Sequence, residues 1–258
     1  MSLAVIQQHA EEKGVSFEES AQIFMQAIVL KHLALPTARL IGGGALVFGH
    51  GNPRFSEDVD LTQVSDPRQL ETGLRNAAAE LEKWFGKSVT LSSPKSDRRT
   101  WRLLCRLSPA RTLRLHVDSQ PYPAYTVHAV VIQFPSIPSF VCESIGLEEI
   151  MAEKMIAVAN RRYLGGRDLF DLWFHWLRQD HWEEMLPTIR SLVIKKLKDR
   201  SITPELWIRN LSERLSPGKS LKRAEEEWRR YLPVEFQKKL VHQEILKACY
   251  RLPEVFSE

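Results

Sequence analysis

Two aspartates separated by one residue are the clearest candidates for chemistry in this chain. Asp58 and Asp60 lie in the stretch 55–64, where they alternate with the apolar Val59 and Leu61. This alternation predicts a strand on which both carboxylates share one face, about 7 Å apart. Two like charges at that distance repel each other unless a cation lies between them. Hard divalent cations such as Mg²⁺ bind such carboxylates together with phosphate oxygens.

A third carboxylate is available on a second predicted strand, over 112–118, where Asp118 lies on the polar face. If the two strands are neighbours, Asp58, Asp60 and Asp118 can together hold two metal ions. One ion would activate an attacking hydroxyl, and the other would neutralise a leaving pyrophosphate. His116 and His175 are interpreted as structural, because the eight histidines show no metal-binding spacing such as H-E-x-x-H.

A run of three glycines precedes the aspartates. Gly42, Gly43 and Gly44 follow a short apolar strand predicted at 38–41 and break it. Glycine lets the backbone come close to a phosphate and offers N–H donors to it. A D-x-D on a strand is usually a solvated face, and a glycine run is usually a turn. A glycine run and a D-x-D together in one strand–turn–strand unit are a much more specific signal than either feature alone.

These segments resemble a known family. The pattern GGxAL at 42–46, followed by RFSEDVDL at 54–61, resembles the first motif of the AbiEii/AbiGii family. These are nucleotidyltransferase-like toxins of the DNA polymerase beta superfamily. The pair EK at 153–154 with Arg161, and then RDLFDL at 167–172, resembles the later motifs of that family. The matches occur in order and span about half of the chain.

The resemblance implies a metal site with Mg²⁺ as cofactor. Asp58 and Asp60 would be the metal-binding, catalytic pair. Asp118 would stand where the superfamily has its third carboxylate, although that match is looser.

The resemblance also implies nucleotide contacts. Lys154 would contact the triphosphate, and Asp168 would be a catalytic position of the last motif. Gly42, Gly43, Gly44 and Arg167 would belong to the nucleotide-binding part. The family usually has Ser or Thr where this chain has Gly44, so one hydroxyl contact to phosphate is missing here.

The elements predict an α+β protein, in which the resemblance implies a small mixed sheet of nucleotidyltransferase type with flanking helices. Helices are predicted over 4–34 and 67–85, further strands over 100–107 and 127–134, and helices alone from 147 onward. This shift predicts two domains, a nucleotidyltransferase-like domain over 1–140 and an all-α C-terminal domain over 141–258.

Composition excludes several classes of protein. Of 258 residues, 43% are apolar and 26% are charged, as in soluble globular domains, which argues against a disordered chain. No apolar run approaches the length of a membrane span, and no secretory signal is recognised, so no membrane partner is expected. Three widely spaced cysteines predict buried thiols and a reducing, cytoplasmic location.

The charge is unevenly distributed. Residues 1–66 hold 4 Lys and Arg against 8 Asp and Glu, whereas the rest of the chain is basic, with dense lysines at 195, 196 and 198. This favours a polyanionic partner such as RNA, and solvated helix surfaces are about as good an interpretation.

The predicted reaction is metal-dependent transfer of NMP from an NTP to an acceptor hydroxyl. The resemblance implies an RNA acceptor, with the tRNA 3′ end as the leading candidate. It also implies a toxin role in a toxin–antitoxin or phage-defence system, with a cognate antitoxin. Two alternatives stay open: nucleotidylation of a small molecule or protein side chain, and nucleotide or RNA binding without catalysis.

Overall fold

The computed structural model describes residues 3–33, 38–64, 66–93, 99–216 and 222–257. The chain divides into two compact units, the first formed by Met1–Gly49 with Ser56–Ile145 and the second by His50–Phe55 with Gly146–Glu258. The change to helices comes after residue 144, rather than near 140, because a strand continues to that point. Segment 50–55, which joins the two halves of the first motif, belongs to the second unit.

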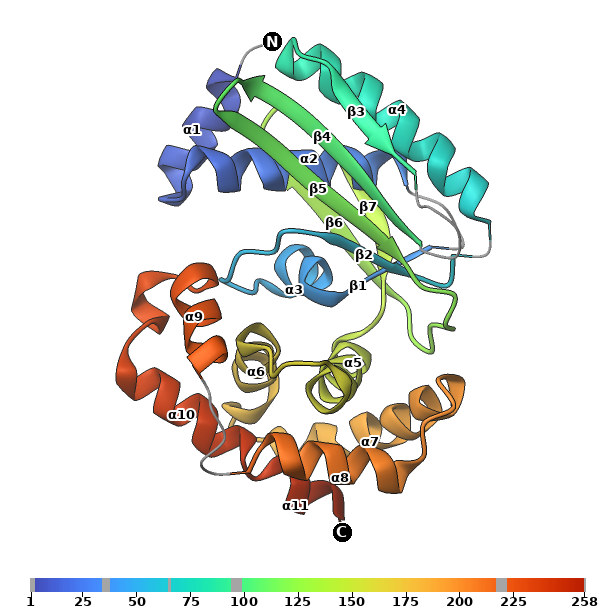
Figure 1. The fold of residues 1–258 in the computed structure, drawn as a ribbon, viewed down its shortest axis with the longest axis vertical. Helices are drawn as coiled ribbons and strands as arrows, with labels where there is room; N and C mark the ends of the chain where they lie inside the picture. Colours follow the sequence, from blue (N-terminus) through green and yellow to red (C-terminus); the bar gives the residue numbers. More distant parts are fainter. Residues whose placement is uncertain (1–2, 34–37, 65, 94–98, 217–221, 258) are drawn as a thin grey trace. The chain divides into compact units, whose positions relative to one another are not determined.

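The first unit is built on a mixed seven-stranded sheet with the order β3-β4-β5-β2-β1-β7-β6 (Figure 1). β2 runs parallel to β5, and β1 runs parallel to β7; the other neighbours are antiparallel. The strands are β1 (Arg39–Ile41), β2 (Val59–Thr62), β3 (Val89–Ser92), β4 (Thr100–Ser108), β5 (Arg111–Ser119), β6 (His128–Phe134) and β7 (Ile137–Ser144). The sheet with its flanking helices confirms the predicted α+β class.

Helices pack against this sheet. They are α1 (Ala4–Lys13), α2 (Phe17–His32), α3 (Gly42–His50) and α4 (Pro67–Phe85). α2 contacts β5, β6 and β7, and α4 lies beside α2 (Figure 1). The single helix predicted over 4–34 is two helices, because Gly14 takes a left-handed φ of 64° and ends the first. Ser16 and Glu19 then form a capping box at the start of the second.

The alternation in the D-x-D segment is confirmed. Val59 and Leu61 are 1% and 2% exposed and belong to the core, while Asp58 and Asp60 are only partly covered. Burying the apolar face while the acids stay at the surface fixes the register of β2, since a slip of one residue would bury both carboxylates.

The glycine run ends the strand as predicted, but the turn expected there was wrong: Gly42, Gly43 and Gly44 form the first turn of α3. The strand β1 ends at Ile41, and the chain turns directly into the helix at Gly42, whose φ of 70° favours glycine. The glycines therefore offer the N–H groups of a helix N-terminus rather than those of a loop.

The second unit contains helices. They are α5 (Leu147–Asn160), α6 (Gly166–Leu172), a π-helix η1 (Trp173–Leu177), α7 (Trp182–Asp199), α8 (Pro204–Arg214), α9 (Lys222–Tyr231), a 3₁₀ turn η2 (Val234–Phe236), α10 (Lys239–Cys249) and α11 (Leu252–Ser257). α5 packs on α6, α7 and α8. α9 crosses α6 closely, since a Cβ on Gly166 would lie 2.3 Å from the carbonyl oxygen of Ala224. None of the helices in the described ranges is both long and apolar enough for a membrane span.

One residue of the predicted basic stretch is not at the surface. Lys196 is fully buried, and its Nζ lies 2.7 Å from carboxylate oxygens of both Glu149 and Glu153. Arg200 pairs with Glu153 on the same side of α5. Lys196 therefore joins α7 to α5 and cannot track an RNA backbone; Lys195 and Lys198 are exposed.

Candidate active site

Three neighbouring strands bring the predicted carboxylates to one face of the first unit's sheet. Asp60 on β2 is directly opposite Asp118 on β5, and Thr100 on β4 is opposite Asp118 on its other side. The sheet register also places Arg102 opposite His116. We call these side chains the polar rows; they are Thr100–Asp118–Asp60 and Arg102–His116–Asp58.

Hydrogen bonds run along both polar rows. His116 Nδ1 lies 3.2 Å from Asp58 Oδ1, and Arg102 Nε donates to His116 Nε2 at 3.1 Å. In the other row the Thr100 hydroxyl donates to Asp118 Oδ1. About a third of the Asp58 and His116 side chains is exposed, so this site is open to small solutes.

The glycine start of α3 packs directly against the aspartates. A Cβ on Gly42 would lie 2.5 Å from Asp60 Oδ2, so any other residue would displace the Asp60 carboxylate and would also be strained at the φ of 70°. A Cβ on Gly44 would lie 3.6 Å from the backbone oxygen of Asp58, an ordinary contact. There is room at position 44 for the Ser or Thr side chain that the family usually has, so steric hindrance does not explain why this chain has Gly44.

The electrostatics of the site suit a cation. Burial raises the pKa of Asp58 above its usual value, His116 opposes that shift, and the charges of Glu57 and Asp118 add to it. Within the described ranges, no three His, Cys, Asp or Glu side chains converge as a metal centre does. Asp58 and Asp118 are instead held by His116 and Thr100. The donor set still fits a hard divalent cation, since three carboxylates lie on adjoining strands.

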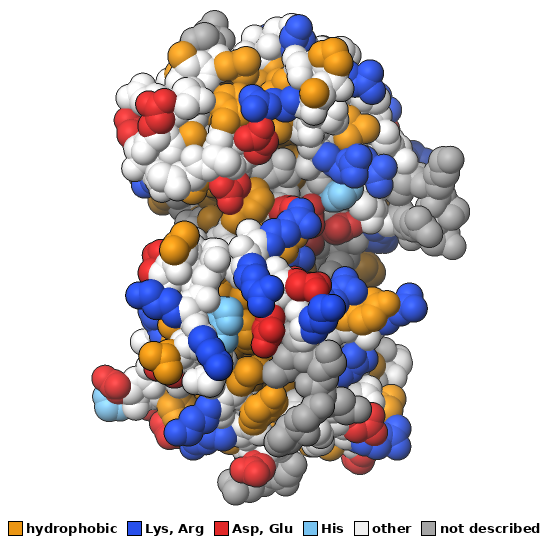
Figure 2. All heavy atoms as spheres, turned by 60° about the vertical axis from the view of Figure 1, so that its left-hand side comes forward, with side chains coloured by type: hydrophobic (Ala, Val, Ile, Leu, Met, Phe, Trp, Pro, Cys, Tyr) orange, Lys and Arg blue, Asp and Glu red, His pale blue; other side chains and the backbone are white. Residues whose placement is uncertain are grey.

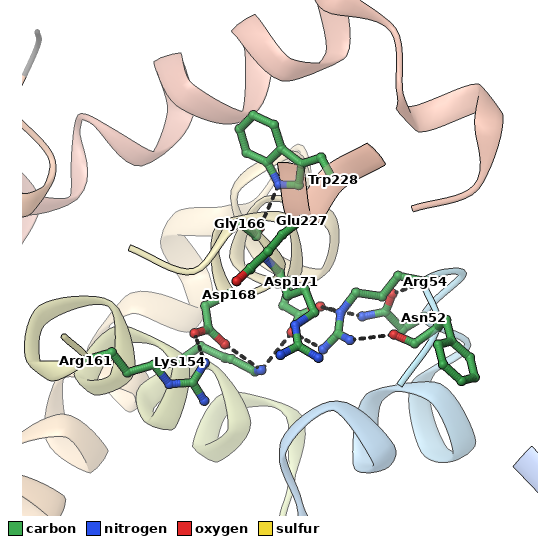
Figure 3. A network of polar contacts seen from close by, with 11 residues as sticks. Asn52, Arg54, Lys154, Arg161, Gly166, Asp168, Asp171, Glu227 and Trp228 are labelled. Carbon is green, nitrogen blue, oxygen red and sulfur yellow. Dashed lines mark hydrogen bonds and ion pairs between the residues drawn. The ribbon is translucent and has the colours of Figure 1, made fainter. Parts of the chain in front are cut away.

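A buried ion network occupies the second unit and is built around Asp171 (Figure 3). Arg54 donates to both of its oxygens, from Nε at 2.6 Å and from Nη2 at 2.7 Å. Asn52 donates at 2.8 Å, and Lys154 Nζ lies 2.8 Å from Oδ2. Asp171 is 0% exposed and Arg54 is 2% exposed. Segment 50–55 is thereby fixed to α6.

Lys154 extends the network to Asp168. Its ammonium donates to Asp168 Oδ1 at 2.8 Å, and Arg161 donates to Oδ2 at 2.6 Å (Figure 3). Both carboxylates of the RDLFDL motif are therefore saturated. Burial would raise the pKa of Asp168, but the charges of Lys154 and Arg161 outweigh it and lower that pKa. For Asp171 the charges of Arg54 and Lys154 likewise outweigh burial and lower the pKa.

The predicted site residues thus fall into two groups. Gly42, Gly43, Gly44, Asp58, Asp60 and Asp118 gather in the first unit. Lys154 and Asp168 gather in the second, where Arg167 stacks its guanidinium 4.4 Å from the Tyr231 ring centre. Sequence reasoning missed Asn52, Arg54 and Asp171 as their partners. Arg54 and Asp171 lie inside the motifs that resemble the family, so the motif pattern was the signal in the sequence that could have identified them.

A π-helix follows the network and buries a histidine. His175 is 8% exposed, and its Nε2 has no hydrogen-bond partner within the described residues. Burial lowers the pKa of His175 from 6.5 to about 4, against the opposing charge of Asp171. The ring is therefore neutral at physiological pH, as expected of a structural histidine. Trp173 and Trp176 of the same π-helix are also buried and belong to the core.

The network predicts a large stability effect at its centre. Asp171→Asn removes the negative charge between Arg54 and Lys154 and leaves both cations poorly paired in the core. We expect a loss of about 3–5 kcal/mol in the free energy of unfolding, measured by urea denaturation. The matched control is Glu71→Gln, which breaks the surface pair with Arg75 and should cost about 0.5 kcal/mol or less. Equal losses in the two variants would contradict the assignment.

His175 predicts a pH dependence of stability. Its pKa is 6.5 when unfolded and about 4 when folded, so the unfolded state binds the proton first as the pH falls. The free energy of unfolding should therefore fall, by about 2 kcal/mol from neutral pH to pH 5, because of this residue. Denaturation curves of His175→Leu should show a drop smaller by that amount. His181→Gln, a change at an exposed histidine, should leave the pH profile as it is.

Comparison with known proteins identifies a family for this chain. The family described as "Nucleotidyl transferase AbiEii toxin, Type IV TA system" matches residues 23–242, which include both polar rows and the buried network. No relative was found among curated proteins.

Two solved structures share the fold. JHP933 from Helicobacter pylori has 19% identity and a TM-score of 0.50, with 94% of this chain and 91% of that chain covered. A second H. pylori protein, described as a candidate nucleotidyltransferase, has 20% identity and a TM-score of 0.51, with 94% and 98% covered. The motif residues, the fold and the family match over most of the chain lead to one conclusion: this protein belongs to the AbiEii nucleotidyltransferase toxin family.

Proposed function

We propose that the protein transfers NMP from an NTP to an acceptor hydroxyl in a metal-dependent reaction. The observation that carries this proposal is the packing of the glycine start of α3 against Asp58 and Asp60, with Asp118 opposite Asp60. A helix N-terminus binds phosphate through its N–H groups and its dipole. Carboxylates beside it are the ligands that a phosphate-bound Mg²⁺ needs.

Each group has a part in this proposal. Asp58, Asp60 and Asp118 would hold Mg²⁺, which neutralises phosphate charge and lowers the pKa of the attacking hydroxyl when bound. The backbone of Gly42, Gly43 and Gly44 would face the phosphates. In this proposal these residues orient the NTP and neutralise its negative charge. Positioning and charge stabilisation are the main contributions of a protein to phosphoryl transfer.

Lys154, Arg167 and Asp168 are proposed as nucleotide-contacting or catalytic residues on family resemblance. In the observed contacts, Lys154 is 7% exposed and bound by two carboxylates, so a triphosphate would compete with both. Asp168 has both oxygens occupied and a lowered pKa, which makes it a poor proton acceptor. These contacts favour a positioning role for both: Asp168 orients Lys154, and Lys154 in turn contacts Asp171, which holds segment 50–55.

An RNA acceptor is part of the proposal, and charge alone does not indicate where it would bind. Basic and acidic side chains alternate over the face in Figure 2. Stacked arginines on the second unit are more informative. Arg162 and Arg223 place their guanidinium groups 5.2 Å and 4.0 Å from the ring centre of the exposed Tyr163. Stacking orders an arginine while its N–H edge stays available for phosphate.

The family description also supports a biological setting. A toxin of a type IV toxin–antitoxin system implies a cognate antitoxin, and an RNA target in the cytoplasm, such as the tRNA 3′ end, would fit such a toxin. A small-molecule or protein acceptor is the alternative. Incubation with NTPs labelled at the α-phosphate, Mg²⁺ and total RNA separates these cases. Label in RNA supports the proposal, and label in protein or small molecules contradicts the RNA acceptor.

The carboxylates predict a loss of chemistry without a loss of fold. Asp58→Asn and Asp60→Asn should each lower the transfer of label by about 100-fold or more, because each removes a charged ligand of the cation. Removing one of several like charges should leave the urea midpoint close to that of wild type. Glu57→Gln, at the neighbouring acid, is the control and should keep its activity. Active Asp58→Asn and Asp60→Asn variants would overturn the metal site.

The stacked arginines predict a change in salt dependence. Removing both phosphate contacts with Arg162→Ala and Arg223→Ala should flatten the log–log salt slope of RNA binding by about 1.4, at 0.7 per phosphate of single strand. The matched control is Lys195→Ala with Lys198→Ala, which removes the same charge from α7. A slope that changes only in the lysine variant would move the RNA surface to α7.

A further inference from the structure

The second polar row contains a histidine whose two ring nitrogens are both occupied. Arg102 Nε donates to His116 Nε2 at 3.1 Å, and His116 Nδ1 lies 3.2 Å from Asp58 Oδ1. The three residues come from adjacent strands or strand ends, and β4 and β5 pair Arg102 with His116 directly. This contact chain is part of the sheet register rather than of a loop.

The donor chemistry of arginine decides where the proton of His116 resides. A guanidinium can only donate, so Nε2 of His116 must offer its lone pair. A neutral imidazole with its lone pair on Nε2 carries its proton on Nδ1. That proton faces Asp58, whose carboxylate can only accept when ionised. Each hydrogen bond in the chain therefore has one allowed direction, from Arg102 through His116 to Asp58.

The same assignment excludes another role for His116. A general base needs a lone pair that faces the proton it removes. In this structure the lone pair on Nε2 is bound by Arg102, and Nδ1 holds a proton that points to Asp58. His116 can orient a carboxylate in this arrangement, but it cannot take a proton from an acceptor hydroxyl.

We infer that His116 is a positioning residue that sets the orientation in which Asp58 meets a divalent cation, and that Arg102 fixes the His116 tautomer this requires. The inference rests on the proposed function. His116 ties down Oδ1 of Asp58, while Oδ2 has no hydrogen-bond partner in the described part of the chain. Groups that orient a ligand in this way typically change metal affinity by about 10–100-fold.

The first test needs no metal. The ¹⁵N NMR signals of the histidine rings in the whole protein report which nitrogen of His116 carries the proton. We expect Nδ1–H for His116 in the wild type and loss of that preference in Arg102→Ala. Arg106→Ala, at another exposed arginine of β4, is the control and should keep Nδ1–H. A proton on Nε2 in the wild type would overturn the inference.

The second test measures Mn²⁺ affinity by calorimetry. His116→Leu should bind Mn²⁺ about 10–100-fold more weakly than the wild type. His116→Asn places an NH₂ group on Cγ where Nδ1 stands, so it should remain within a few-fold of the wild type. Transfer activity should follow the same order, since Asn replaces the donor but could not replace a base.

The outcomes separate this inference from the proposed function. A wild type that binds no Mn²⁺ overturns the proposed function and this inference with it. A wild type that binds Mn²⁺, together with a His116→Leu variant of equal affinity, overturns this inference alone. So does a folded His116→Asn variant that is as impaired as His116→Leu, because a positioning hydrogen bond would have been restored.

Discussion

The Arg54–Asp171 ion pair is the interaction on which the conformation of segment 50–55 depends. Segment 50–55 connects the end of α3 to the approach to β2, and Arg54 holds this segment to α6 through both oxygens of Asp171. The attraction within a buried ion pair offsets the free-energy cost of desolvating the two charges only when all of their hydrogen bonds are formed. Asn52 and Lys154 complete them. We infer that the pair contributes conformational specificity, because it restricts segment 50–55 to one conformation.

The aspartates of the family motifs lie in opposite electrostatic environments. Asp58 is partly exposed, and burial and the nearby acids raise its pKa although His116 opposes the shift, so its negative charge is incompletely compensated. Asp168 and Asp171 are buried among cations and have lowered pKa values, so their charges are already compensated. The presence of an aspartate in a motif does not distinguish these two environments. The number of cationic side chains around the aspartate distinguishes them, and that number is set by the tertiary structure.

Local signals in the sequence predicted the elements that are stabilised locally. α4 was predicted with its observed bounds, because Asp66 caps its start, Pro67 fits its first turn and Gly86 ends it. β7 was missed, because Pro138 normally ends a strand. Here it is exposed within the strand. The glycine run was taken for a turn, since nothing local shows that Gly42 must make room for Asp60.

The candidate site could be predicted only where its members are close in sequence. The D-x-D pair and its shared face follow from alternation alone. The burial of Lys154 and Lys196 could not be foreseen, because lysine is normally exposed and their partners are set by helix packing. Arg54 and Asp171 are 117 residues apart, so their pairing is decided by tertiary structure. His116 was interpreted as structural, and its contact with Asp58 depends on a strand pairing that no local pattern specifies.

The polar rows explain how the sheet accommodates three neighbouring carboxylates. Repulsion among Asp58, Asp60 and Asp118 would favour protonation or displacement of a strand. Donors from the next strands oppose it, with His116 at Asp58 and Thr100 at Asp118. A hydrogen bond to a charged group typically contributes about 1.5–3 kcal/mol, and solvent exposure lowers that contribution for these partly exposed pairs. On the proposed function, a cation at this site would have to replace or share these donors. Its affinity would depend on how much more strongly it attracts the carboxylates than the donors do, so residues of β4 and β5 would tune a site whose proposed ligands lie at β2.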